Sequence, residues 1–492
     1  MKPYLLSIDQ GTTSSRAIIF DQQGNLIHSA SQEFTQHYPQ NGWVEHDPDD
    51  ILQSVLNTIK QTLNESGITV AQISAIGICN QRETTLIWNK KTGKTIYNAI
   101  VWQDRRTAQY CHELSEQGHG ELINAKTGLL IDAYFSATKI RWILDNVEGA
   151  RHAAEQGELA FGTVDTFLLW HLTEGQSHFT DATNASRTLL YNIHTHSWDA
   201  ELLALFDIPR SMLPEVKNSA DDFGTCHLFG APLCIGGIAS DQQAALIGQG
   251  CFTEGMAKST YGTGCFLMVN TGKLALTSHN KLLTTIAYQI DGEASYAIEG
   301  SIFIAGAAVQ WMRDNLHLFR CATDTEDLLA KTNLNHGVYF VPALTGLGAP
   351  YWDPDARGAI SGLTRASGIN EIVSAGIQSV GYQTKDLLAA IEQDGISIHT
   401  MRIDGGMAAN NWFMQFLADI LAINIERPVT VETSALGAAY LAGLHKGLFD
   451  STAHIQQLWQ AEQQRQPQLD REVVSALYQG WQDAVRKVLV CQ

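Results

Sequence analysis

Apolar and polar positions follow a regular order along the first eighty residues. Short apolar runs at residues 4–8 and 16–20 are stopped by polar, glycine-containing segments, and a third run starts at Leu26. Runs of this length between such turns are typical of an antiparallel meander. Apolar residues then recur every three or four positions between 51 and 63, after Asp47-Pro48, which predicts a helix. An apolar run at 73–78 predicts the next strand.

The second half of the chain repeats this order. Residues 256–261 lead into Gly262-Thr263-Gly264 and out through an apolar run at 265–269. Further strands are predicted at about 283–290 and 295–298, and helices at about 304–316 and 372–392. The repetition predicts an α/β fold of two related domains, residues 1–250 and 251–492, with the boundary near 248–255 and a cleft between them, a favoured position for ligands. The glutamine-rich segment 456–468 is predicted to be a surface loop or linker.

Composition and charge narrow the function classes. Of the 492 residues, 45% are hydrophobic and 17% charged, which excludes disorder as the main state. Thirty-two basic against 51 acidic residues give a net charge of −19, which argues against a nucleic-acid partner. No apolar run is long enough for membrane insertion, and the eight cysteines, Cys491 included, form no CxxC pair. We therefore expect a cytoplasmic protein with free thiols.

The first hairpin turn carries a candidate phosphate site. Asp9-Gln10-Gly11 is followed by hydroxyl side chains and by Arg16. Gly11 permits a tight turn whose N–H groups can cradle phosphate oxygens, and Asp9 could hold Mg²⁺. An ordinary hairpin with an exposed aspartate explains this segment equally well when it is considered alone.

Two later segments add to this picture. Gly262-Thr263-Gly264 repeats the turn in the second half, so that two such hairpins facing one cleft would clamp a polyphosphate from both sides. Residues 403–411 form a strand end, a diglycine turn and a polar helix start, where an adenine and its ribose have access to flat backbone. A plain turn with Asn410 or Asn411 as a helix cap is the alternative.

Taken together, these turns resemble the superfamily of ATP-binding folds that contains sugar kinases, heat-shock proteins and actin. Five further blocks are similar to the FGGY carbohydrate kinases, and among these to the members that act on glycerol. They read NQRETT at 80–85, AIVWQDRR at 99–106, TNASRT at 183–188, SDQQAA at 240–245 and GLGAPYWDP at 346–354. The resemblance covers residues 4 to about 445 and leaves only the C-terminal tail outside.

The resemblance implies a fold of two actin-like (ribonuclease H-like) ATPase domains around an interdomain cleft. The implied activity is ATP-dependent phosphorylation of glycerol to sn-glycerol 3-phosphate, the first step of glycerol catabolism, with Mg²⁺. A kinase for another polyol or ketose is the alternative within the family. A nucleotide-switched assembly protein related to actin or chaperones is the alternative from another class.

The same resemblance assigns roles to individual residues. Asp241 is the expected catalytic base; as an alternative or additional role it could cap the helix at 243–247. The residues expected at glycerol are Arg82, Glu83, Trp102, Tyr134, Asp241, Gln242 and Phe266. The residues expected at ATP are Thr12, Thr13, Ser14, Arg16, Thr263, Gly306, Gln310, Gly406 and Asn410, with Asp9 on the metal side. Paired donors and acceptors beside aromatic faces suit a small neutral polyol.

The loop at residues 225–234 departs from the family pattern. It contains no Lys or Arg, so the sugar bisphosphate inhibition found in some bacterial members is not expected. His227 with Leu228-Phe229-Gly230 is similar to a loop histidine that a phosphotransferase carrier protein phosphorylates in other members. An exposed histidine without a role is the simpler interpretation. By the same resemblance we expect a homodimer or homotetramer.

Overall fold

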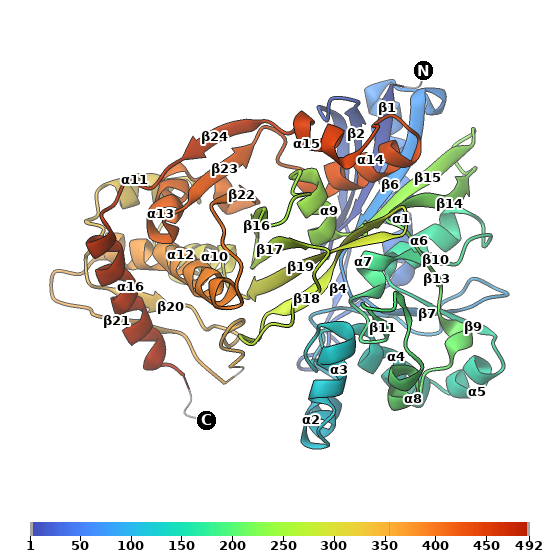
Figure 1. Cartoon of the computed structure of the whole chain (residues 1–492), viewed down its shortest axis with the longest axis horizontal. Helices are drawn as coiled ribbons and strands as arrows, with labels where there is room; N and C mark the ends of the chain where they lie inside the picture. The colour runs from blue at the N-terminus through green and yellow to red at the C-terminus, as the bar shows by residue number, and fades with distance from the viewer. Residues whose placement is uncertain (1–2, 354, 490–492) are drawn as a thin grey trace.

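The computed structural model describes residues 3–353 and 355–489 and consists of two halves, each built on a mixed β-sheet (Figure 1). Pro354 of the GLGAPYWDP block and Cys491 lie outside the described residues.

The N-terminal sheet has six strands in the order β14-β15-β6-β1-β2-β3. The meander forms as predicted, and its bounds are β1 Tyr4–Gln10, β2 Ser14–Asp21 and β3 Leu26–Glu33. On the other side of β1, β6 (Ile73–Asn80) and β15 (Leu233–Ser240) run parallel to it, and β14 (Ala220–Cys226) closes the edge. The carboxyl ends of β1, β6 and β15 therefore meet at one edge of the sheet.

The C-terminal sheet repeats this plan with seven strands in the order β18-β19-β17-β16-β22-β23-β24. Its antiparallel part contains β16 Ala257–Tyr261, β17 Cys265–Gly272, β19 Glu293–Ile302 and β18 Leu283–Ile290. Its remaining strands are β22 Thr400–Asp404 and β23 Asn424–Pro428, parallel to β16, and the antiparallel edge strand β24 Ala461–Arg465. The predicted α/β fold of two related halves is confirmed.

Local sequence accounts for the helices that cover the sheets. α1 (Pro48–Ser66) begins with the carboxylate of Asp47 accepting from the N–H of Asp49, and it ends at Gly67 in the left-handed conformation. α12 (Ile369–Gln393) buries Val373, Ile377 and Val380 in the C-terminal core. α14 (Thr433–His445) belongs to the second half of the sequence but packs on β1, β6 and β15 of the N-terminal sheet and on α9 (Asp241–Gly248) (Figure 1).

The remaining elements surround these two layers. The helices are α2 Ala108–Glu116, α3 Gly120–Thr127, α4 Ser136–Asn146, α5 Ala150–Glu155, α6 Val164–Leu172, α7 Ala182–Ala185, α8 Ala200–Phe206, α10 Gly306–Asp314, α11 Asp324–Ala330, α13 Asn411–Leu421, α15 Thr452–Leu458 and α16 Arg471–Arg486. The short strands are β4 Gln36–His37, β5 Glu45–His46, β7 Leu86–Asn89, β8 Ala99–Ile100, β9 Leu159–Gly162, β10 Phe179–Asp181, β11 Tyr191–Asn192, β12 Ser197–Trp198, β13 Glu215–Lys217, β20 Tyr339–Val341 and β21 Ala359–Ser361.

One organisational prediction is wrong. The glutamine-rich segment 456–468 is not a loop, because it contains the end of α15 and the strand β24, which pairs antiparallel with β23. β24 is polar after Ala461 and half-exposed to exposed, so it lacks the apolar alternation that identifies a strand in sequence.

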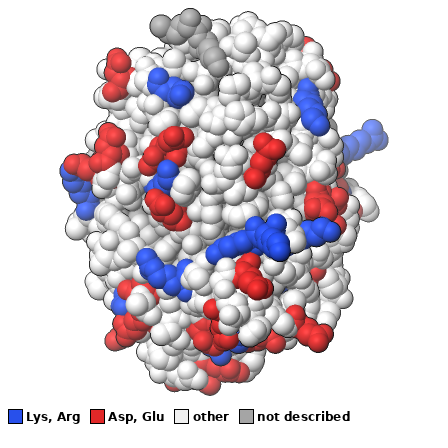
Figure 2. Space-filling view, turned by 90° about the vertical axis from the view of Figure 1, so that its right-hand side faces the viewer, with Lys and Arg blue, Asp and Glu red and all other residues white. Residues whose placement is uncertain are grey.

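The surface charge, the helix lengths and the cysteines bear on the expectations from composition. Basic and acidic side chains are interspersed on the face that Figure 2 shows. Among the described residues, no helix is long and apolar enough to cross a membrane. Seven cysteines lie in the described part of the chain and all seven are free.

Candidate active site

Two neighbouring parallel strands bring the first site residues together. Arg82 follows the end of β6 and Asp241 follows the end of β15, where Asn80 and Ser240 pair in register. Carboxyl ends of adjacent parallel strands meet at one edge of a sheet, and that edge is a favoured ligand position. Arg82 Nε lies 3.3 Å from Asp241 Oδ1.

A buried ion-pair network joins this edge to the other half of the molecule. Glu299 on β19 accepts from both terminal nitrogens of Arg82, with Oε1 to Nη2 at 3.0 Å. The Glu299 Oε1 atom lies 3.3 Å from Arg187 Nη2, and Glu83 Oε1 lies 2.7 Å from Arg187 Nε. Burial alone would raise the pKa of Glu299, but Arg187 and Arg82 lower that pKa to about 2. Glu299 therefore stays ionised at neutral pH, and its ion pairs hold the end of β6 against β19.

Two of its polar atoms have no partner in the described structure. Glu83 Oε2 and Arg187 Nη1 are buried, and neither makes a hydrogen bond there. Glu83 also has a φ of 58°, in the left-handed region that non-glycine residues rarely adopt. An unsatisfied carboxylate oxygen beside Arg82 is an acceptor that a ligand hydroxyl would satisfy.

Three aromatic side chains lie against the arginine. The ring of Trp102 packs edge-to-face with Tyr134 at 5.5 Å between centroids and with Phe266 at 6.5 Å. The guanidinium of Arg82 lies 5.6 Å from the centroid of Phe266, and its Nη2 is 3.4 Å from the hydroxyl of Tyr134. Predicted residues from four separate parts of the chain thus meet around Arg82.

Asp241 is the first residue of α9. Its side chain keeps 29% of its exposure. Burial raises the pKa of its carboxyl to about 6, more than the attraction of Arg82 lowers it. The alternative role as helix cap is wrong, because Ser240 occupies the cap position. The Asp241 carboxylate accepts from the adjacent N–H of Gln242 at 2.7 Å and pairs with Arg82, and it stays partly exposed, so a ligand can reach it.

Gln242 has a partner that the sequence did not reveal. Its Oε1 accepts from the ammonium of Lys258 on β16 at 2.5 Å, and both side chains are buried. Like the ion pair between Arg82 and Glu299, this contact joins the N-terminal half to the C-terminal half. Burial lowers the pKa of Lys258 from its ordinary value.

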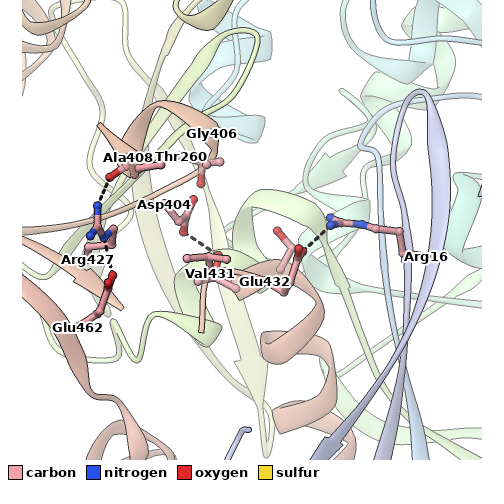
Figure 3. Close-up of a pocket in the computed structure, with 13 residues that line it drawn as sticks. Arg16, Thr260, Asp404, Gly406, Ala408, Arg427, Val431, Glu432 and Glu462 are labelled. Carbon is pink, nitrogen blue, oxygen red and sulfur yellow. Dashed lines mark hydrogen bonds and ion pairs between the residues drawn. The ribbon is translucent and has the colours of Figure 1, made fainter. Parts of the chain in front are cut away.

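A cavity of about 600 Å³ lies beside this cluster, between the two halves. Figure 3 shows Arg16 reaching into it from β2, opposite Asp404 and Gly406. Asp404 accepts from Thr433 Oγ1 at 2.6 Å and from Gln249 Nε2 at 2.7 Å, which fixes the end of β22. Gly405 has a φ of 86°, and a Cβ there would lie 2.5 Å from the carbonyl oxygen of Tyr261, so this position of the diglycine turn requires glycine.

Arg16 bridges the mouth of the cavity. It lies 2.5 Å from Asp9 Oδ2 and 2.5 Å from Glu432 Oε2, so one guanidinium contacts both halves. Asp9 is buried, and within residues 3–353 and 355–489 the one donor to its second oxygen is the thiol of Cys79, at 3.4 Å. That oxygen remains available as a hard donor of the kind that Mg²⁺ prefers.

The other predicted nucleotide residues lie outside this cavity lining, which includes only Arg16 and Gly406 of the predicted set. Thr12 Oγ1 accepts from the indole nitrogen of Trp102 at 2.9 Å, so it contacts the aromatic cluster. Thr13 and Thr263 are exposed, Ser14 begins β2, Gly306 begins α10, and Gln310 is exposed on α10. Asn410 caps α13 by accepting from the N–H of Phe413.

Sequence reasoning missed charged residues at both sites: Arg187, Lys258 and Glu299 in the cluster around Arg82, and Arg427, Glu432 and Glu462 in the cavity lining. Glu299 carried a usable signal, because it is a single acid in the otherwise apolar and small run 297–302. A charge at such a position must find a buried partner. Glu432 had no signal, since only the tertiary fold brings it to Arg16.

Comparison with known proteins supports the sequence resemblance. Residues 4–248 match the N-terminal domain and residues 257–445 the C-terminal domain of the FGGY family of carbohydrate kinases. Glycerol kinase 1 of Pseudomonas aeruginosa is 59% identical over 490 residues, which are 99% of each chain, and glycerol kinase of Geobacillus kaustophilus is 55% identical over 493 residues, again 99% of each.

Solved structures agree with this relationship. Plasmodium falciparum glycerol kinase with ADP has a TM-score of 0.92 at 37% identity and 99% coverage of both chains. A ligand-bound xylulose kinase from Lactobacillus acidophilus, at 21% identity over 98% of both chains, shares the fold with a TM-score of 0.88. The predicted resemblance is confirmed: this chain belongs to the FGGY family of carbohydrate kinases.

Proposed function

We propose that this protein transfers the γ-phosphoryl group of ATP to glycerol and releases sn-glycerol 3-phosphate and ADP. The observation that carries the proposal is the unsatisfied, buried Glu83 Oε2 next to Arg82, in a cluster closed by three aromatic rings. This arrangement suits a small neutral molecule that offers hydroxyl donors on one side and C–H groups on the other. Curated relatives named glycerol kinase, at 55 to 59% identity, support the same substrate.

Each part of the cluster has a task in this proposal. Arg82 donates to a glycerol hydroxyl, while Glu83 and Asp241 accept from hydroxyls. Gln242 and Tyr134 complete the polar contacts, and Trp102 and Phe266 cover the carbon skeleton. The ion pairs to Glu299 and Arg187 fix the donors and acceptors before the substrate arrives, so little ordering remains to be done on binding.

Asp241 is the proposed catalytic base. Its carboxylate accepts the proton of the 3-hydroxyl as that oxygen bonds to the γ-phosphorus and the bond to the β,γ-bridging oxygen breaks. A pKa of about 6 leaves most of the carboxylate ionised at pH 7, yet basic enough to take the proton.

The cavity between the halves is the proposed site of ATP. Arg16 and the turn residues Thr12, Thr13 and Ser14 would contact the phosphates from the N-terminal side. The proposed contacts from the other side are Thr263, Gly306, Gln310, Gly406 and Asn410. Because only Arg16 and Gly406 line the cavity itself, engagement of the rest requires the halves to close, and closure also excludes water from the transfer.

Asp9 is the residue we propose to hold Mg²⁺ on the phosphate side. A buried carboxylate with one oxygen engaged only by a weak thiol donor fits this hard cation. When bound, Mg²⁺ would neutralise negative charge on the phosphates.

Three organisational predictions stay open. The division into domains 1–250 and 251–492 would be tested by limited proteolysis near residue 250. The homodimer or homotetramer would be tested by light scattering.

His227 is exposed in the loop between β14 and β15, so a phosphorylating carrier protein can reach it. Incubation with a phosphorylated phosphotransferase carrier protein, followed by mass spectrometry, tests it; an unmodified His227 contradicts it.

A coupled assay of ADP release tests the proposed function against its alternatives. Glycerol, erythritol, xylulose and ribulose are compared at equal concentrations, and we expect the highest kcat/KM for glycerol. A higher kcat/KM for another polyol or ketose would identify that compound, and not glycerol, as the substrate. Stimulation by none of them would refute the kinase proposal and favour a nucleotide-switched assembly protein, although the position of Trp102 and Tyr134 beside Arg82 argues against that class.

A further inference from the structure

Three side chains of metal-binding type meet at the edge of the N-terminal sheet that is remote from the proposed active site. Asp222 on β14, Cys234 on β15 and His445 at the end of α14 each direct one ligand atom to a common point, with all three atoms within 4.8 Å of one another. The three elements are neighbours in the upper right of Figure 1.

The fold builds this cluster from distant parts of the sequence. β14 and β15 pair antiparallel with an irregularity between Ala220 and Gly224, which displaces Asp222 from the regular register. The carboxylate of Asp222 is oriented by the N–H of Gly224, which donates to Oδ1 at 3.0 Å. A Cβ on Gly236 would lie 3.1 Å from Cδ2 of His445, so the absence of a side chain there lets the imidazole approach the strand closely.

The donor set is specific in its chemistry. A thiolate, an imidazole and a carboxylate together suit Zn²⁺ and other borderline divalent metals, whereas Mg²⁺ and Ca²⁺ require oxygen donors. Tetrahedral Zn²⁺ with bonds of about 2.0 to 2.3 Å places its ligand atoms roughly 3.5 Å apart, so shifts on the order of 1 Å would close the site.

The free site keeps its thiol protonated, so a metal must displace the proton in order to bind. Burial raises the pKa of the Cys234 thiol, and the ammonium of Lys446 offsets part of that rise. Cys234 and His445 are half-buried while Asp222 is exposed, so the open side of the cluster faces water, which can supply the fourth ligand. On binding, the metal replaces the thiol proton, which is released to solvent.

We propose that Asp222, Cys234 and His445 form a Zn²⁺ site that fastens the hairpin of β14 and β15 to the end of α14. α14 spans 13 residues, or about 20 Å, between Thr433 at the cavity and His445. The proposed metal site is therefore separate from the proposed active site, and a test of metal binding does not depend on the proposed glycerol kinase activity.

Cobalt substitution tests the proposal without using activity. The full-length protein, free of any histidine tag and stripped of metal with a chelator, is titrated with Co²⁺ and then with Zn²⁺. We expect one equivalent of Co²⁺ to give a thiolate-to-cobalt charge-transfer band with the intense visible bands of a tetrahedral complex, and Zn²⁺ to abolish both. Absence of the charge-transfer band, or bands typical of octahedral cobalt, would overturn the proposal.

Variants assign the ligands. Cys234→Ser should abolish the charge-transfer band, and Asp222→Asn and His445→Gln should each weaken Zn²⁺ binding more than about tenfold, since loss of even a group that only orients a ligand costs that much. Cys321→Ser is the matched control, because Cys321 is an exposed thiol elsewhere, and it should bind as wild type does. Circular dichroism verifies that each variant is folded, and Asp222→Asn changes only an exposed side chain. A band that persists in Cys234→Ser, or that is lost in Cys321→Ser, would overturn the assignment.

Discussion

Replacement of Glu299 by glutamine tests the buried network that holds the substrate cluster. Glu299 is fully buried and bonds to Arg82 and Arg187, which come from the other half of the molecule. Glu299→Gln keeps the shape of the side chain but removes its charge. The positive charges of Arg82 and Arg187 are then balanced by fewer carboxylates, those of Asp241 and Glu83.

The magnitude follows from the pKa of the carboxyl. The pKa falls from an ordinary value of 4.5 to about 2. At 1.36 kcal/mol per pKa unit this corresponds to about 3 kcal/mol of stability. A lowered pKa contributes stability above the ordinary value of 4.5, and this contribution is lost as the pH falls through 2. Removal of one partner of a buried pair costs about 3 to 5 kcal/mol in other proteins, in agreement with this figure.

Equilibrium urea unfolding at pH 7, followed by circular dichroism, measures the change. We expect Glu299→Gln to lower the free energy of unfolding by about 3 kcal/mol. The KM for glycerol should also rise, because Arg82 loses its anchor. Glu293→Gln is the matched control on the same strand, since Glu293 is exposed and pairs with exposed Lys273, and its midpoint should equal that of wild type. Equal midpoints for Glu299→Gln and wild type would refute the reasoning.

Three other predictions concern the kinetics. The value of kcat/KM for glycerol should fall about tenfold per pH unit below a pH of about 6, because protonation of Asp241 removes the base; a profile flat to pH 5 would contradict its role. Arg82→Ala should raise the KM for glycerol by about tenfold or more, with a smaller effect on kcat, and an unchanged KM would remove Arg82 from the substrate site. Arg16→Gln should raise the KM for ATP by about tenfold and leave that for glycerol unchanged, and the opposite pattern would place Arg16 outside the phosphate site.

The sequence was sufficient for those parts of the fold in which local signals agree. The helix at 48–66 has a cap, a proline start, an apolar face and a terminal glycine, and both meanders have glycine turns between apolar runs. The polar strand β24 has no such pattern, because an exposed edge strand is defined by its backbone pairing and not by buried side chains.

The candidate site residues could be named only through the family resemblance. The structure brings Arg82, Trp102, Tyr134 and Phe266 together. Their stabilising partner Glu299 lies 217 residues from Arg82 along the chain, and one sequence without the tertiary fold cannot pair the two. The helix-cap alternative for Asp241 failed for a local reason, since the helix begins at Asp241, two residues before the predicted start at 243, and Ser240 takes the cap position.

The central claim is that Asp241 removes the proton from a bound glycerol hydroxyl. The most direct measurement compares Asp241→Asn with the wild type in two quantities. These are kcat, measured from ADP release, and the Kd for glycerol, measured by calorimetry. The account predicts that kcat falls by about 10² to 10⁴-fold while glycerol still binds within about tenfold of wild type. A kcat near that of wild type would contradict it.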